Sequence, residues 1–253
     1  MNNILITAAN SKYFDSLKTL ISSIHKTSYD IVDEIIIYDL GLDVLEIDFL
    51  NGLEKCKTVN IKNAYLGDLP FDEFLDPTCY AFKCFCLVDA RKYGENIFWL
   101  DSGACALQSI YKIFEIIKND EIFCVGDKHL NKNYTSYKCS ELMSATETEL
   151  NDTQLSAGII GYKKNGKHQH IFDKAYEFSK IKDCIIGHEN NHRHDQSIFS
   201  ILMSRFNIVK QDIDIYGYWT DYNRNIDTAI MNNAVIFVHR RGHNDTKDLK
   251  LKK

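Results

Sequence analysis

Short, uninterrupted apolar runs recur along the chain, separated by segments in which apolar residues have helical spacing. We predict that the runs are strands, because a strand buried on both faces of a sheet shows no polar alternation. The predicted strands cover residues 3–7, 34–38, 58–61, 96–100, 122–126, 154–162 and 235–239.

Amphipathic helices are predicted between these strands. In the first, residues 12–25, the apolar side chains of Phe14, Leu17, Leu20 and Ile24 fall on one helical face. The other predicted helices cover residues 46–53, 78–92, 107–118, 170–179 and 196–206. The alternation of strand and helix predicts an α/β fold with a mostly parallel, Rossmann-like sheet flanked by helices.

Composition indicates one globular domain. The 253 residues are 45% hydrophobic and 26% charged, and only 2 Pro and 12 Gly break the chain. We expect a single domain over residues 1–245 and a basic, solvated tail over residues 246–253. No apolar run is long enough to span a membrane and no secretory signal precedes the first strand, so we expect a cytoplasmic protein, with weak contact to an inner membrane face possible through the tail.

Charge and cysteine content narrow the class further. The net charge of −5 argues against a nucleic-acid binder, which usually carries a basic face. The eight cysteines lie mostly in apolar runs, so we expect reduced, buried thiols rather than disulfides.

Ligands of parallel α/β sheets bind where the strands end at their carboxyl edge. The candidate site residues on this ground are Thr7, Ala8, Ala9, Asn10, Asp39, Asp101, Ser102, Gly103, Asp127 and His239. No Gly-x-Gly-x-x-Gly follows the first strand, which disfavours a nicotinamide or flavin site, and no phosphate-binding Gly-x-x-x-x-Gly-Lys loop occurs.

The strongest local feature is FWLDSG, residues 98–103, in which an apolar strand runs into Asp101. A carboxylate in such a place is costly unless it has a partner or a function. The structural alternative is that Asp101 caps or turns the chain into the helix predicted at 107–118.

The order of these elements resembles a GT-A-type glycosyltransferase of the family 8-like kind. The resemblance is carried by ILITAANSKYFDSL (4–17), DEIIIYDLG (33–41), YAFKCFCLVDA (80–90), IFWLDSG (97–103), QLSAGIIGYKK (154–164), HDQSIFSIL (194–202) and VIFVHRRGH (235–243). Residues 80–90 and 97–103 are similar to the helix and the strand that lead to an Asp-x-Asp motif. Here the motif has the Trp-x-Asp-Ser-Gly form seen in some bacterial relatives.

The resemblance implies a single GT-A-like domain with a smaller, acceptor-binding half beside the sheet. It also implies a transferase that moves a sugar from a nucleoside diphosphate sugar, UDP-linked, to a hydroxyl of a glycan or glycolipid. It implies that Asp101 and His239 hold Mn or Mg. Because Gly103 replaces the second carboxylate, Lys83, Arg240 and Arg241 could instead neutralise the diphosphate directly.

Further roles follow from the same resemblance. Asp39 would accept a hydrogen bond from the base, with Thr7, Ala8, Asn10 and Tyr13 lining its pocket, while Lys83 would reach the ribose or diphosphate. Asp195, Gln196 and Arg240 would be catalytic. Independently of the resemblance, the placement of charge predicts that Lys83, His239, Arg240, Arg241 and His243 converge at the strand ends in a local cationic pocket that suits a small diphosphate.

Each of these residues also has an ordinary structural interpretation. Lys83 could be a solvated helix lysine, Asp195 a helix N-cap, and residues 156–158 a strand bulge rather than a close approach to a sugar. Trp219 could stack on an acceptor ring or pack in a loop. The sequence does not distinguish an inverting from a retaining reaction.

Two functions of other classes remain. The missing second carboxylate is compatible with a non-catalytic nucleotide-sugar-binding protein. HENNH at 188–192 matches the His-Glu-x-x-His pattern of zinc hydrolases. That pattern needs a helix, which two consecutive asparagines disfavour, and no later glutamate supplies a third ligand.

Overall fold

The computed structural model describes residues 2–188 and 190–252. A six-stranded sheet of order β3-β2-β1-β4-β7-β6 lies at its centre. The strands are β1 (Asn3–Ala9), β2 (Glu34–Asp39), β3 (Cys56–Asn60), β4 (Asn96–Leu100), β6 (Ile122–Leu130) and β7 (Thr153–Lys163). The first four are parallel, whereas β7 runs antiparallel to both β4 and β6. The sheet is therefore mostly parallel, as predicted, with one reversed strand in its second half.

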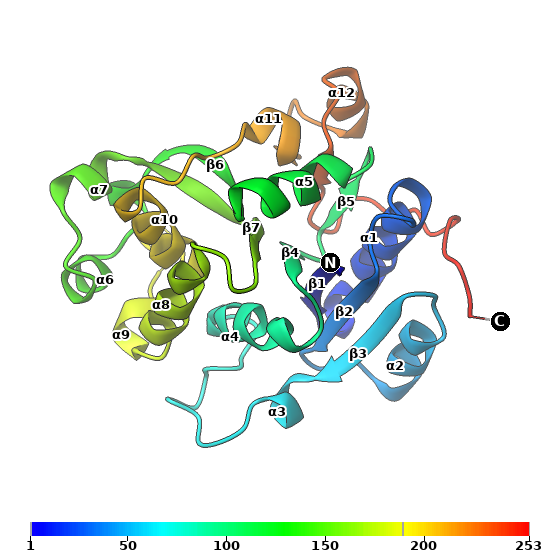
Figure 1. Ribbon diagram of the computed structural model, residues 1–253, viewed down its shortest axis with the longest axis horizontal. Coiled ribbons are helices and arrows are strands. Elements are labelled where there is room, and N and C mark those ends of the chain that lie inside the picture. Colours follow the sequence, from blue (N-terminus) through cyan, green and yellow to red (C-terminus); the bar gives the residue numbers. More distant parts are fainter. Residues whose placement is uncertain (1, 189, 253) are drawn as a thin grey trace.

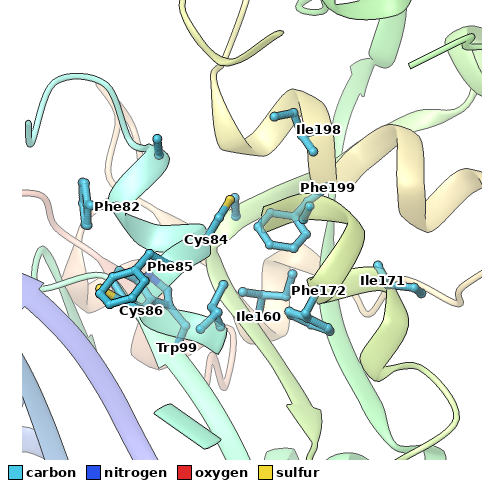
Figure 2. Packing of buried hydrophobic residues seen from close by; sticks show 14 of the residues in the cluster. Phe82, Cys84, Phe85, Cys86, Trp99, Ile160, Ile171, Phe172, Ile198 and Phe199 are labelled. Carbon is cyan, nitrogen blue, oxygen red and sulfur yellow. The ribbon is translucent and has the colours of Figure 1, made fainter. Parts of the chain in front are cut away.

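Both faces of the sheet are covered, because successive side chains of each strand point to opposite faces. On one face, α1 (Phe14–Thr27) and α5 (Tyr111–Asp120) pack against the β1 side chains that point to this side, such as Leu5. On the other face lie α4 (Ala81–Asp89), α8 (Gln169–Ser179) and α10 (Asp195–Arg205). Figure 2 shows this second core, in which Phe85 and Cys84 of α4 gather with Phe172 and Phe199 around Trp99 and Ile160 of the sheet.

The remaining helices are short, and most lie around the outside of the central sheet (Figure 1). They are α2 (Val44–Asn51), α3 (Ile61–Ala64), α6 (Tyr137–Leu142), α7 (Glu147–Asn151), α9 (Lys182–Ile185), α11 (Ile213–Tyr216) and α12 (Ile226–Met231), with single 3₁₀ turns at Ser11–Tyr13, Ala90–Lys92 and Asn131–Asn133. None of the helices in the described ranges has the length and apolarity to span a bilayer.

A second, three-stranded sheet of order β5-β9-β8 is the part of the architecture that the sequence pattern did not predict. Its strands are β5 (Ala104–Ala106), β8 (Tyr218–Trp219) and β9 (Ile236–Val238). Strands of two or three residues leave no periodic signal, so only β9 was predicted, as residues 235–239. Since β5 follows Asp101 directly, this sheet brings the chain after β9 to the end of β4.

Two other expectations are refined. The side chains at the end of the basic tail are exposed, with that of Leu251 65% exposed, but its backbone is fixed: the Lys252 N–H donates to Gly52 O at 2.8 Å, and Leu251 bridges to Leu53. Lys253 lies outside the described residues. The helix predicted at 107–118 begins only at Tyr111, so Asp101 is not its cap. All eight cysteines are buried free thiols, as predicted.

Candidate active site

A cavity of about 770 Å³ opens where β4 ends. Its wall is built by the start of α4, the turn after β4, the middle of β7, the start of α10 and the chain after β9. Six of the candidate residues named at the strand ends or from the family resemblance as catalytic or ligand-binding line it: Lys83, Asp101, Asp127, Asp195, Gln196 and Arg240. They come from five separate stretches of chain, which the fold brings together around this cavity.

Lys83 lies between two aspartates at the base of this cavity. Its Nζ is 3.2 Å from Asp101 Oδ1 and 3.1 Å from Asp195 Oδ2. The Lys83 and Asp195 side chains are each 4% exposed, whereas that of Asp101 is 45% exposed. Lys83 is thus not a solvated helix lysine: α4 points it into the core, where only ion pairing makes its charge tolerable.

Burial and charge act on this cluster in opposite directions. Burial by itself would lower the pKa of Lys83, but the two carboxylates outweigh it and the pKa is raised, so the ammonium persists. Burial raises the pKa of Asp195 above the ordinary aspartate value despite its ion pair, and the Asp101 charge adds to that shift. Asp195 is the first residue of α10 rather than its N-cap, which is His194.

The orientation of Asp101 is set by its neighbours. The Trp99 Nε1–H donates to Asp101 Oδ1 at 2.6 Å, and the Asp101 N–H donates to Gly158 O at 2.9 Å. A Cβ on Gly158 would lie 2.7 Å from Asp101 Oδ2. Because residue 158 is glycine and has no Cβ, the Asp101 carboxylate has room in this position. The β6–β7 register also shifts here, between the Cys124–Ile160 and Gly126–Leu155 pairs, so the strand irregularity expected at 156–158 is present.

Gly103 has an equally definite role. The N–H groups of His239 and Arg240 both donate to Gly103 O, at 3.0 and 2.7 Å. A Cβ on Gly103 would lie 2.7 Å from Arg240 O and 2.9 Å from Arg240 Cα. The backbone after β9 thus fills the space that a side chain at the third position of the Asp-Ser-Gly motif would need.

His239 is buried behind this contact. Burial, with a smaller contribution from His243, lowers its pKa to about 4, so the ring is neutral at neutral pH. Neither ring nitrogen makes a well-formed hydrogen bond within the described chain. A neutral imidazole with unused nitrogens is a suitable metal ligand. His239 does not line the main cavity, however, and the described residues hold no group of three or more metal-ligating side chains.

Three residues at the cavity have positive φ although none is glycine: Tyr80 (63°), His194 (51°) and Arg240 (59°). Each such conformation costs about 1–3 kcal/mol and persists only where surrounding structure enforces it. The Tyr80 and His194 rings stack with centroids 5.2 Å apart, joining the segment before α4 to the segment before α10 across the rim. Six other non-glycine residues of the described chain also have positive φ, so the cavity holds three of nine such positions.

Arg193 also lies in the cavity wall, although it was not among the residues predicted from the sequence. Arg193 Nη1 donates to Asp127 Oδ2 at 2.8 Å and to Gln154 Oε1 at 3.3 Å, and the same Oε1 accepts from Gln196 Nε2 at 2.9 Å. The guanidinium also lies 3.6 Å from the Tyr134 ring centroid. This chain of contacts fixes the side-chain amide of Gln196. No sequence signal marked Arg193, because its partners are distant in the chain.

The residues expected around a base lie outside the cavity lining. Asp39 Oδ1 accepts from the N–H groups of Gly41 and Leu42, at 2.8 and 2.7 Å. Thr7 Oγ1 and Asn10 Oδ1 are buried without a hydrogen-bond partner in the described chain. The Arg241 guanidinium lies 5.5 Å from the Tyr13 ring centroid.

Ala8 and Ser102 are buried but do not line the main cavity, and His243 lines a second, smaller one beside α1. The predicted convergence of cations is therefore partial: Lys83 and Arg240 share one cavity, whereas Arg241 and His243 face elsewhere. Trp219 lines the main cavity, and the Arg240 guanidinium lies 5.5 Å from its ring centroid.

The zinc-hydrolase pattern is not on a helix. Residues 186–188 and 190–194 connect α9 to α10, and Glu189 lies outside the described residues. His192 is fully buried, where its Nδ1 accepts from the Ser136 N–H at 3.3 Å and its Nε2 donates to Ile185 O at 3.2 Å. Both ring nitrogens are used within the protein, so His192 has no free nitrogen for a metal.

Solved structures share this fold. The chain matches the apo structure of WbbM, a bifunctional glycosyltransferase, with a TM-score of 0.64 and 13% identity over 98% of this chain, but only 48% of that one. It matches the galactosyltransferase LgtC, in complex with donor and acceptor sugar analogues, with a TM-score of 0.57 and 12% identity over 95% of this chain and 88% of that chain.

The Mn/GDP form of core-mannan synthase A from Aspergillus fumigatus matches with a TM-score of 0.54 and 9% identity, over 81% of this chain and 70% of that one. No protein-family model and no curated protein sequence matches the chain. The chain thus has the GT-A glycosyltransferase fold, which confirms the predicted fold class.

Proposed function

We propose that the protein is a glycosyltransferase that moves a sugar from a nucleoside diphosphate sugar, UDP-linked, to a hydroxyl group of a glycan or glycolipid acceptor. The observation that carries this proposal is the Asp101–Lys83–Asp195 cluster at the carboxyl end of β4, in a fold shared with glycosyltransferases. Parallel α/β sheets bind ligands at this edge. The family 8-like kinship and the single-carboxylate form of the Asp-x-Asp motif are part of the same proposal.

Asp101 and His239 are the proposed ligands of a divalent cation, Mn or Mg. The residues fit such an ion: Asp101 Oδ2 makes no hydrogen bond among the described residues, and His239 is neutral with unused ring nitrogens. When bound, the ion would act as a Lewis acid toward the leaving diphosphate. Two protein ligands leave the other coordination positions to diphosphate and water oxygens.

Arg240 is the proposed catalytic cation of this chain. Among the charged side chains that line the described cavity, Lys83, Lys128, Arg193 and Arg224 each have a carboxylate partner, whereas Arg240 has none. Its guanidinium is exposed and can bind the oxygens of the leaving diphosphate, where negative charge develops in the transition state.

Asp195 and Gln196 are proposed to bind the transferred sugar. Asp195 is held by Lys83, and the Gln196 amide is fixed through Gln154, so both are pre-oriented at the cavity wall. A buried carboxylate with a raised pKa suits contact with sugar hydroxyls. The backbone of residues 156–158 can approach the sugar closely.

The base pocket is proposed at the ends of β1 and β2, with Thr7, Ala8, Asn10, Tyr13 and Asp39. Two buried oxygens without partners, Thr7 Oγ1 and Asn10 Oδ1, support a polar ligand there. Because β1 pairs with β4, their carboxyl ends lie side by side. Ser102, Gly103, Arg241 and His243 would complete the nucleotide site around the turn after β4.

The test combines binding and turnover. Calorimetry with UDP- and GDP-sugars, with and without Mn, is expected to show donor binding, and donor hydrolysis or transfer is expected to fall about 100-fold in Asp101→Asn. Asp173→Asn is the matched control, because Asp173 is also 45% exposed and paired to a cation, Arg91. Binding without turnover on any acceptor would favour a non-catalytic nucleotide-sugar-binding protein. Full turnover in Asp101→Asn would contradict the site assignment.

A further inference from the structure

A polar stripe runs along α1 beneath the C-terminal segment. Ser16, Thr19, Ser22 and His25 follow one another every three residues and are 1–3% exposed. Burying four polar side chains on one helix face is unfavourable unless each is hydrogen-bonded. The apolar residues of α1, such as Leu17 and Leu20, pack into the sheet core, so the stripe serves a different neighbour.

That neighbour is the main chain of residues 240–250, which we call the strap. Ser16 Oγ donates to Arg240 O at 3.0 Å. Thr19 Oγ1 accepts from the Asp245 N–H and Ser22 Oγ from the Asp248 N–H, both at 3.1 Å. His25 Nδ1 accepts from the Lys250 N–H at 3.0 Å. Every residue of the stripe binds a backbone group of the strap, and Thr19 Oγ1 also lies 3.5 Å from Asn244 Oδ1.

The far end of the strap is fixed to the turn after α2. The Glu54 N–H donates to Lys250 O at 2.8 Å, and His25 Nε2 donates to Glu54 O at 2.9 Å. His25 therefore joins the strap and this turn through its two ring nitrogens. Figure 1 shows the C-terminal segment passing α1 and ending near α2.

The near end of the strap is Arg240, at the main cavity. Its backbone has φ of 59°, a conformation that needs outside support. Hydrogen bonds hold it from both sides, with the Arg240 N–H on Gly103 O and the Ser16 hydroxyl on Arg240 O. Loosening the strap would release one of these two supports.

We propose that the hydroxyl and imidazole stripe of α1 is the positioning device of Arg240, acting through the strap. Ser16, Thr19, Ser22 and His25 are positioning residues: they touch no part of the main cavity. The part of this inference that concerns donor binding rests on the proposed function. The part that concerns the order of the Arg240 backbone does not.

Amide hydrogen exchange tests the structural part. In Thr19→Val with Ser22→Ala, exchange at the Asp245 and Asp248 amides and at the Arg240 amide is expected to rise on the order of tenfold, as one or two lost hydrogen bonds would give. Thr27→Val is the matched control, because the Thr27 hydroxyl bonds only within and just after α1. Thr19→Ser, which keeps the hydroxyl, is expected to retain the slow exchange. Ser22→Ala alone is the milder variant if the double one folds poorly.

Donor kinetics test the functional part. The double variant is expected to raise the donor KM on the order of tenfold with a smaller change in kcat, because a displaced cation weakens diphosphate binding. Unchanged exchange at the Arg240 amide would overturn the positioning role, and so would raised exchange with an unchanged donor KM. A wild-type protein that turns over no donor would contradict the proposed function. Hydrogen exchange at the Arg240 amide would still test whether the strap orders the Arg240 backbone.

Discussion

A Cβ atom on Gly103 would lie 2.7 Å from the carbonyl oxygen of Arg240, closer than side chains approach backbone atoms. The third position of the Asp-Ser-Gly motif is thus occupied by the chain that follows β9. The Arg240 backbone occupies the space that any side chain at position 103 would need, so glycine at this position is a packing requirement.

Gly103→Ala is therefore expected to destabilise the protein by about 1–3 kcal/mol, the usual cost of overpacking, because the nearest atoms are backbone and cannot rotate away. Urea unfolding measures the change. Gly126→Ala is the control, since its Cβ would meet a Lys210 side-chain atom at an ordinary 3.4 Å. Equal stability of the two variants would contradict the close packing of Gly103 against Arg240.

Gly158→Ala is expected to separate activity from stability. Its Cβ would lie 2.7 Å from Asp101 Oδ2, the end of a half-exposed side chain whose other oxygen is bound by Lys83 and Trp99. Because a side chain can move where backbone cannot, the loss of unfolding free energy should be smaller than the cost of overpacking, about 1–3 kcal/mol. Donor turnover should fall up to about 100-fold, because catalysis tolerates such displacement poorly. Steady-state kinetics beside urea unfolding provide the measurement. A variant that loses stability but keeps full turnover would show that donor turnover does not depend on the position of the Asp101 carboxylate.

Lys83→Met is expected to lower the free energy of unfolding by about 3–5 kcal/mol, because it leaves the buried Asp195 carboxylate without its cation. Adding Asp195→Asn should recover part of this loss by removing the charge. Lys180→Met is the matched control: its pair with Glu177 is largely exposed and should contribute less than about 1 kcal/mol. No recovery in the double variant would mean that the cost of Lys83→Met comes from packing.

Acid should weaken the fold through His192. Burial, with a contribution from His194, lowers its pKa from 6.5 to about 4. Between these two values the unfolded chain binds the proton and the folded chain does not, so stability falls as pH drops through that window. The loss reaches about 3 kcal/mol for this one residue. Unfolding free energy measured from pH 7 to pH 4 should decline less steeply in His192→Gln, and identical slopes would contradict the assignment.

The strands and the main helices could be predicted from local sequence. Runs such as residues 96–100 are apolar throughout, and the spacing of Leu17, Leu20 and Ile24 fixes one helix face, so burial alone selects these elements. The same reasoning placed Asp101 at the carboxyl edge of the sheet. It did not find β5 or β8, which are held by pairing with β9 rather than by any pattern of their own.

The sequence by itself therefore determined the fold class and the sheet edge at which the candidate site lies, because both follow from periodic burial along short stretches. Only the tertiary structure decided what the individual polar residues do. It places Lys83 between two aspartates and packs Gly103 against the backbone of Arg240. It also hydrogen-bonds the polar face of α1 to the main chain of the strap. Ser16 and Arg240 are 224 residues apart, and no local pattern can encode a hydrogen bond that exists only after the sheet has brought its partners together.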